Sequence, residues 1–143
     1  MECIFCDQSL ERFLIKKFEY WTVYLNENQY YLGRVYITLN RHGPESINDL
    51  TKQEWDEFKD IIEKVTKTLG SLYKFDLMNY AMLHNTIRNH FHMHLIPRYV
   101  DTRIVHGEEF KDELWGKSPF SAPKKEFDEK LLMKIKEEIQ KEL

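Results

Sequence analysis

Hydrophobic and polar positions divide the chain into strand-like and helix-like segments. The residues from Phe18 to Asn26 and from Tyr30 to Asn40 are rich in aromatic and β-branched side chains, which predicts two strands. The short polar link between them predicts a hairpin. Another strand is predicted from Phe75 to Leu83. In HFHMHLIPRY, histidines and apolar residues alternate strictly, which predicts a further strand that should stop at Pro97.

Two other segments repeat their apolar residues at helical spacing. In the first, Thr51 followed by Glu54 forms a capping box, and Gly70 is placed to end the helix. Its apolar positions are Trp55, Phe58, Ile61, Ile62, Val65 and Leu69. The second helix is predicted over residues 126–143, with an apolar stripe of Phe127, Leu131, Ile135 and Ile139. Locally paired strands around one long helix indicate an antiparallel α+β domain.

Composition narrows the functional classes. The 143 residues suit a single domain, and a 42% hydrophobic content can build a core. Charged residues make up 31% of the chain with a net charge of -3, which argues against binding a nucleic-acid polymer. No segment is apolar and long enough for a membrane span, and the N-terminus lacks a secretory signal. We therefore predict a cytoplasmic protein that does not associate with membranes.

The alternating motif concentrates half of the chain's 6 histidines on one strand. Because residues two apart share a face of a strand, His90, His92 and His94 should point one way and the apolar residues between them toward the long helix. A chance run on an exposed strand is the plain alternative. Two functional interpretations remain open: a three-histidine zinc site that activates water, and a histidine nucleophile supported by its neighbours.

The motif resembles the H-φ-H-φ-H-φ-φ signature of the histidine triad (HIT) nucleotide hydrolases and transferases, where φ is apolar. HFHMHLI fits it at every position, and PRY follows. CIFC at the start, the hairpin with Gly33, TLNRH, DLT and a late Trp115 are also similar to this family. The resemblance implies the HIT-like fold, an antiparallel sheet of about five strands with one long helix packed on it and a C-terminal helix. It also implies a single HIT domain over 1–143, with a core at 1–115 and a C-terminal extension at 116–143.

The resemblance implies a nucleotide hydrolase or nucleotidyl transferase. His92 would attack the α-phosphorus and form a nucleotidyl-histidine intermediate, which water resolves, and His94 would hydrogen-bond phosphate oxygens. Expected substrates are dinucleoside polyphosphates and nucleoside phosphoramidates, with no catalytic cofactor. The family also implies a homodimer, and we hypothesise that residues 99–123 reach the partner's pocket. A His90/His92/His94 zinc hydrolase and a non-catalytic nucleotide-binding module are the competing hypotheses.

Further substrate-binding positions follow from the same resemblance. Asn26 would hold the ribose hydroxyls, Arg34 stands where the family often has histidine, and Asn79 would contact the phosphate region. Asparagines at such positions are also typical of turns and strand ends. The pre-triad loop HNTIRN departs from the usual Gly-Gln-Ser/Thr and lacks the leaving-group glutamine, although Asn85 and Thr86 can still donate hydrogen bonds.

A pair of cysteines near the N-terminus suggests a metal. Cys3-x-x-Cys6 alone is half a zinc site, and a redox pair is less favoured because no βαβ pattern surrounds it. The resemblance implies that His42 and His90 complete a Cys2His2 site. Four protein ligands leave no open position, so this zinc would be structural and would stiffen the strand that carries His92.

Overall fold

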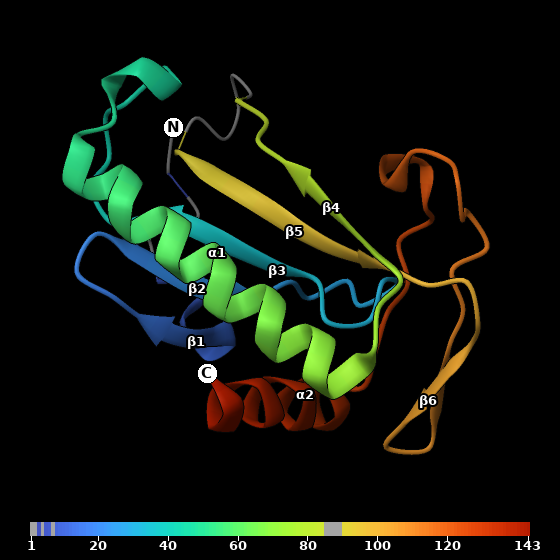
Figure 1. The fold of residues 1–143 in the computed structure, drawn as a ribbon. Helices are drawn as coiled ribbons and strands as arrows, with labels where there is room; N and C mark the ends of the chain where they lie inside the picture. Colours follow the sequence, from blue (N-terminus) through green and yellow to red (C-terminus); the bar gives the residue numbers. More distant parts are fainter. Residues whose placement is uncertain (1–2, 4, 7, 85–89) are drawn as a thin grey trace.

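The computed structural model describes residues 3, 5–6, 8–84 and 90–143, and it has the predicted α+β architecture. Five strands form one antiparallel sheet in the order β1-β2-β3-β5-β4, and a small β6-β7 hairpin stands apart from it. One long helix and a C-terminal helix complete the fold (Figure 1). The elements are η1 (Glu11–Phe13), β1 (Leu14–Lys17), β2 (Trp21–Leu25), β3 (Val35–Leu39), η2 (Ile47–Asp49), α1 (Lys52–Tyr73), β4 (Leu77–Ala81), β5 (His92–Arg98), β6 (Arg103–Val105), β7 (Glu108–Phe110), η3 (Pro119–Ser121) and α2 (Glu129–Glu142).

The predicted hairpin forms between β2 and β3, but its connection is longer than predicted. Trp21 pairs with Leu39 and Leu25 with Val35, so residues 26–34 make up the link. Gly33 within it has φ +83, and a Cβ there would lie 3.0 Å from the Tyr73 ring. Only glycine therefore fits this approach of the hairpin to α1. Strand β1 was not predicted, because its four residues are too few to show an alternation.

Helix α1 begins as predicted but extends further. The side chains of Thr51 and Glu54 form the capping box at its start. The prediction that Gly70 ends the helix is wrong, because the chain stays helical to Tyr73, and Lys74 takes the left-handed conformation instead. Continuing the helix buries the Tyr73 ring, which is 3% exposed. That burial offsets the roughly 1 kcal/mol that a glycine costs inside a helix.

The core fills the space between one face of the sheet and the two helices (Figure 1). Trp21 stacks on Phe58 with ring centroids 4.2 Å apart, and its indole N–H donates to the Glu54 carbonyl at 2.8 Å. Helix α2 lies against α1 and β1. The Gln140 amide donates to two carbonyls of β1, which satisfies edge groups that a sheet otherwise leaves open. None of the helices in the described ranges is both long and apolar enough to span a membrane.

Strand β5 carries the histidine motif and passes through Pro97. The prediction that Pro97 stops the strand is therefore wrong. Pro97 pairs with Met78 of β4, whereas the pairing of β5 with β3 ends at Leu95, opposite Val35. The strand is thus paired on one side at Pro97, and a proline, which has no backbone N–H to donate, is tolerated there.

Candidate functional site

The three histidines line the face of the sheet opposite the core. His92 and His94 belong to β5, and His90 lies just before it. The intervening Phe91, Met93 and Leu95 belong to the core cluster, which agrees with the predicted alternation. All three histidines are buried, with His92 only 6% exposed.

The ring of His92 is oriented by the backbone. Its Nδ1 lies 2.7 Å from the carbonyl oxygen of His90. A carbonyl can only accept, so Nδ1 carries the proton of the neutral ring and Nε2 carries the lone pair. This arrangement makes His92 Nε2 the basic and nucleophilic nitrogen of the ring.

The ring of His94 is oriented in the opposite sense. Its Nδ1 lies 3.2 Å from Nη2 of Arg34. A guanidinium can only donate, so Nδ1 of the neutral His94 ring accepts and Nε2 carries the proton. Two neighbouring histidines on one face of β5 therefore hold different tautomers, one suited to attack and one suited to donate a hydrogen bond.

Arg34 brings a positive charge into this face. Its Nε is buried and has no hydrogen-bond partner, the one such side-chain atom found among the described residues. Burial lowers the pKa of Arg34, but a guanidinium remains charged at neutral pH. In the part of the chain that the structure describes, no carboxylate forms an ion pair with it. A partly buried cation that has no carboxylate partner among the described residues favours binding of an anion.

Aromatic rings surround the histidines. Phe5 covers His92 with ring centroids 5.2 Å apart, and it also contacts Tyr36 at 5.7 Å. Tyr36 lies 4.8 Å from His94, directly opposite it in the register of β3 and β5. Phe5 and Tyr36 could not be predicted from the sequence, because the histidine motif does not indicate which distant residues contact it. The pairing register, once known, identifies Tyr36.

The hairpin loop places Asn26 and Arg34 side by side. The Asn26 N–H donates to the Arg34 carbonyl at 3.0 Å. The buried amide of Gln29 donates to the carbonyls of both residues and accepts from the Gly33 N–H at 2.8 Å. Asn26 Oδ1 itself accepts from the Asn28 N–H, which is turn chemistry. Its ribose-binding role stays a prediction, and Gln29 is a positioning residue that sequence reasoning missed.

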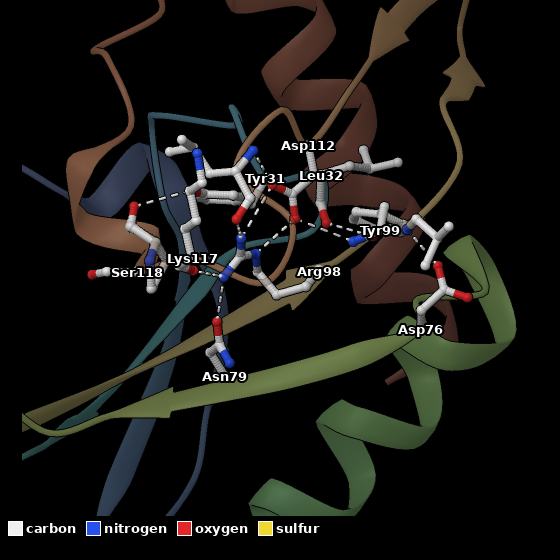
Figure 2. A network of polar contacts seen from close by, with 12 residues as sticks. Tyr31, Leu32, Asp76, Asn79, Arg98, Tyr99, Asp112, Lys117 and Ser118 are labelled. Atoms are coloured by element: carbon white, nitrogen blue, oxygen red, sulfur yellow. Dashed lines mark hydrogen bonds and ion pairs between the residues drawn. The ribbon is translucent and has the colours of Figure 1, made fainter.

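Of the other predicted substrate contacts, Asn79 lies within the described residues. Asn79 Oδ1 accepts from Nη1 of Arg98 at 2.8 Å, so Asn79 belongs to a buried network around Arg98 (Figure 2). Its contact with the phosphate region stays a prediction. Asn85 and Thr86 lie outside the described residues.

Cys3, Cys6, His42 and His90 form a cluster that could bind a metal, and their ligand atoms all lie within 4.8 Å of one another. Nδ1 of His90 lies 3.4 Å from Sγ of Cys3, 3.5 Å from Sγ of Cys6 and 3.2 Å from Nδ1 of His42. A tetrahedron with metal–ligand distances of 2.0–2.3 Å has edges of about 3.3 to 3.8 Å. The three separations from His90 are therefore close to the edges of a tetrahedral Cys2His2 site.

His90 presents the correct nitrogen to this cluster. Its Nε2 donates to the carbonyl oxygen of Leu39, which leaves the lone pair on Nδ1, toward the two sulfur atoms. Burial lowers the pKa of His90, which favours the neutral ring that ligates metals. Among the described residues, no group of three ligand atoms suited to a metal includes His92 or His94.

Comparisons with known proteins agree with this geometry. The family model of the HIT domain matches residues 8–101, which is more than half of the chain. A histidine triad protein from Sinorhizobium meliloti has a similar structure (TM-score 0.76, 17% identity, covering 96% of this chain and 95% of that chain). So do a hypothetical histidine triad nucleotide-binding protein from Sulfolobus tokodaii (0.70, 17%, 98% and 91%) and the Plasmodium falciparum diadenosine triphosphate hydrolase in complex with cyclomarin A (0.60, 15%, 92% and 74%). Such identities establish the fold alone. A search of curated proteins found no match.

Proposed function

Because the chain belongs to the HIT family, we propose that it cleaves nucleoside-phosphate compounds through a covalent nucleotidyl-histidine intermediate on His92. The observation that supports this best is the pair of opposite tautomers on His92 and His94 beside the Arg34 guanidinium, whose buried Nε has no hydrogen-bond partner among the described residues. A lone pair, a hydrogen-bond donor and a cation on one face match the requirements of attack on an anionic phosphorus centre. The hydrolase named among the similar structures supports dinucleoside polyphosphates as a substrate class beside phosphoramidates.

The reaction would proceed in two displacements. Nε2 of His92 forms a bond to the α-phosphorus while the bond to the leaving group breaks, and the leaving group takes up a proton from solvent, which the attacking water of the second step returns. As Nε2 is substituted, the ring becomes cationic, and the hydrogen bond from its Nδ1 to the His90 carbonyl strengthens. Water then breaks the phosphorus–nitrogen bond and releases the nucleoside monophosphate. The Nε2 proton of His94 and the charge of Arg34 stabilise the phosphate oxygens in both steps.

Substrate must reach a nucleophile that the N-terminal segment covers. His92 is 6% exposed, and the Phe5 ring lies over it. We infer that the Phe5 ring shifts when a nucleotide binds. Its position between Cys3 and Cys6 ties this movement to the metal-binding segment.

We propose that the Cys3, Cys6, His42 and His90 cluster holds zinc. Two thiolates and two imidazoles are a typical ligand set for a structural zinc, and the separations from Nδ1 of His90 to the other three ligand atoms, 3.2–3.5 Å, are close to the edges of such a site. When bound, zinc would supply a cross-link between the N-terminal segment and the backbone two residues before His92. No catalytic step requires it.

The alternative of a His90/His92/His94 zinc hydrolase is less well supported. Nδ1 of His90 points at the two sulfur atoms, and Nδ1 of His92 points at a backbone carbonyl. The three rings therefore do not direct lone pairs to a common point through these nitrogens. A nucleotide-binding module without turnover is the second candidate, favoured by the missing glutamine in the pre-triad loop.

Turnover of a substrate panel separates these functions. Mononucleotide esters, nucleoside phosphoramidates and dinucleoside polyphosphates would be incubated with the wild type and with His92→Ala. His106→Gln would serve as the control, because the His106 ring contacts Glu138 of α2. We expect His92→Ala to lose roughly a thousandfold or more in kcat/KM. A substrate labelled at the α-phosphate should leave acid-labile label on the wild type. Nucleotide binding without label or cleavage would support the binding module.

We also propose a homodimer. Strand β4 is an edge of the sheet, and it exposes Leu77 (51%) and Tyr80 (56%). An exposed edge strand with large apolar side chains is a typical surface for pairing with a second copy.

A further inference from the structure

The two cysteines lie close enough to react with each other. The Cys6 N–H donates to the Cys3 carbonyl at 2.9 Å, which closes a tight turn. Both cysteines are reduced, and their Sγ atoms lie within 4.8 Å of one another. A Cys-x-x-Cys pair in such a turn can be joined by a disulfide after rotation of its two side chains, without movement of any distant part of the chain.

An oxidant can reach this pair from solvent. Cys6 is exposed, and Cys3 is only partly buried. A thiol that coordinates a metal is deprotonated, and the thiolate is the form of cysteine that reacts with an oxidant. The two thiolates of the proposed zinc site therefore combine the charge state and the accessibility of reactive cysteines.

The same segment covers the nucleophile of the proposed reaction. The ring of Phe5, which lies between the two cysteines in the sequence, contacts His92 and His90 with ring centroids 5.2 and 5.6 Å apart. His92 is 6% exposed under this cover. A cavity of about 230 Å³, lined in part by Phe5, Tyr24 and Thr38, gives the ring space to move. Movement of the ring away from His92 would open the nucleophile to solvent.

The proposed zinc site would fasten this cover to the sheet. Nδ1 of His90 lies 3.4 Å from Sγ of Cys3 and 3.5 Å from Sγ of Cys6. Coordination of all three atoms to one metal would link the segment that carries Phe5 to the backbone two residues before His92. A disulfide removes both thiolates from the ligand set, and the two histidines that remain are too few to hold a structural zinc. Disulfide formation would therefore also release the tether on Phe5.

We propose that Cys3 and Cys6 form a redox switch that controls access to His92. The oxidant is hydrogen peroxide or another two-electron peroxide. The two thiolates are oxidised to a disulfide, the oxygen–oxygen bond of the peroxide breaks, and two protons from solvent complete two water molecules. The reduced, metal-bound form is closed, and the disulfide form is open. This inference rests on the proposed zinc site, and it does not depend on the reaction at His92.

Chemical labelling of His92 tests the switch. Reduced, zinc-loaded protein is treated with hydrogen peroxide, peptide mass spectrometry detects the Cys3–Cys6 disulfide, and a chromophoric chelator measures the zinc released. Diethyl pyrocarbonate, which modifies accessible imidazole nitrogens, then gives the labelling rate of His92, with the exposed His106 as the reference in the same sample. We expect oxidation to raise the His92 rate by roughly threefold to tenfold relative to His106, the factor that corresponds to loss of the aromatic contacts of Phe5. Dithiothreitol with added zinc should restore the low rate.

Variants and metal removal identify the cause of the change. Phe5→Ala should label His92 at the high rate before and after peroxide. Cys3→Ser should do the same, because it can form neither the disulfide nor the four-ligand site, whereas Phe5→Tyr retains a ring and should retain the peroxide response. Thermal melting verifies that these variants fold. In the reduced wild type, removal of zinc by a chelator should also raise the rate, which tests the tether without any substitution.

The outcomes separate the switch from the other proposals. Oxidation to sulfinic acids in place of the disulfide, an unchanged His92 rate after the disulfide forms, or a peroxide response that persists in Phe5→Ala would each overturn the switch. A reduced protein that holds no zinc would refute the proposed metal site, and faster His92 labelling on oxidation would then support the thiol switch alone. Labelling is measured without turnover, so a failure to cleave nucleotides would refute the nucleotidyl-histidine reaction and leave these rates as the test of the switch.

Discussion

Replacing Asp112 with asparagine should destabilise the fold more than any other single change of charge in the C-terminal segment. The Arg98 guanidinium has five N–H groups, and its Nε, Nη1 and Nη2 atoms make five hydrogen bonds. Two of these go to the Asp112 carboxylate, at 2.7 and 3.2 Å. The same carboxylate accepts from the backbone N–H groups of Tyr99 and Leu114. Asn keeps the shape of this residue but removes the charge that balances Arg98.

The magnitude follows from the burial of the pair. Both side chains are almost inaccessible to water, with Arg98 3% and Asp112 1% exposed. Removing one partner of a buried ion pair costs about 3–5 kcal/mol, because the other charge stays buried without compensation. A domain of this kind has about 5–15 kcal/mol of stability in total. With a urea slope of about 2 kcal/mol per molar, the unfolding midpoint should fall by about 2 M.

Urea unfolding followed by tryptophan fluorescence measures this difference. Glu113→Gln is the matched control, because it makes the same change of charge at the adjacent, exposed position and should shift the free energy of unfolding by less than about 0.5 kcal/mol. Replacing both members of the pair, Arg98→Met with Asp112→Leu, should cost less than Asp112→Asn alone, since no unpaired charge remains. If Asp112→Asn and Glu113→Gln unfold at the same urea concentration, the Arg98–Asp112 ion pair is accessible to water and the predicted cost of breaking it is wrong.

Three further predictions concern the metal cluster, a helix start and the sheet edge. Cys3→Ser should abolish binding of about one zinc per chain whereas His92→Ala retains it, as metal analysis of purified protein would show; the reverse result would favour the three-histidine site. The hydrogen bond from Arg41 lowers the pKa of the Glu54 carboxyl. The ionised Glu54 side chain therefore stabilises the fold at neutral pH, and this stabilisation is lost as the pH falls through the lowered pKa. Glu54→Gln should therefore unfold about 1–3 kcal/mol more easily at neutral pH, with a smaller difference in acid, and a pH-independent difference would contradict this. Tyr80→Lys should convert a dimer to a monomer in light scattering, and an unchanged mass would place the interface elsewhere.

The parts of the fold that the sequence predicts are those with local, repeated patterns. The alternation around His92 identified a strand and its two faces, and the apolar spacing of α1 identified a helix with its capping box. The errors at Gly70 and Pro97 have a shared cause. Each residue weakens an element locally, but a tertiary feature outweighs that effect: burial of Tyr73 in one case and the absence of β3 beside Pro97 in the other.

The parts of the site that the sequence does not predict depend on contacts between distant segments. Phe5 reaches His92 across 87 positions of the chain, and Phe120 reaches His94 across 26. Neither ring belongs to a spaced motif, so no pattern relates it to a histidine. The cluster that could bind a metal differs in this respect. Cys3 and Cys6 have a recognisable spacing, and the family resemblance supplied His42 and His90, which the structure brings together with them.

The chemistry of the triad does not follow from the histidines alone. His92 and His94 have the same ring on the same strand face, and both alternate with residues of the core cluster. What differs is the group that each Nδ1 meets: a carbonyl, which can only accept, at His92, and a guanidinium, which can only donate, at His94. A histidine at position 34 could either donate to or accept from Nδ1 of His94, so it would leave the tautomer of His94 undetermined. Arginine at this position therefore leaves the Nε2 proton on His94, and the backbone carbonyl leaves the Nε2 lone pair on His92, which is the lone pair that the proposed attack on phosphorus requires.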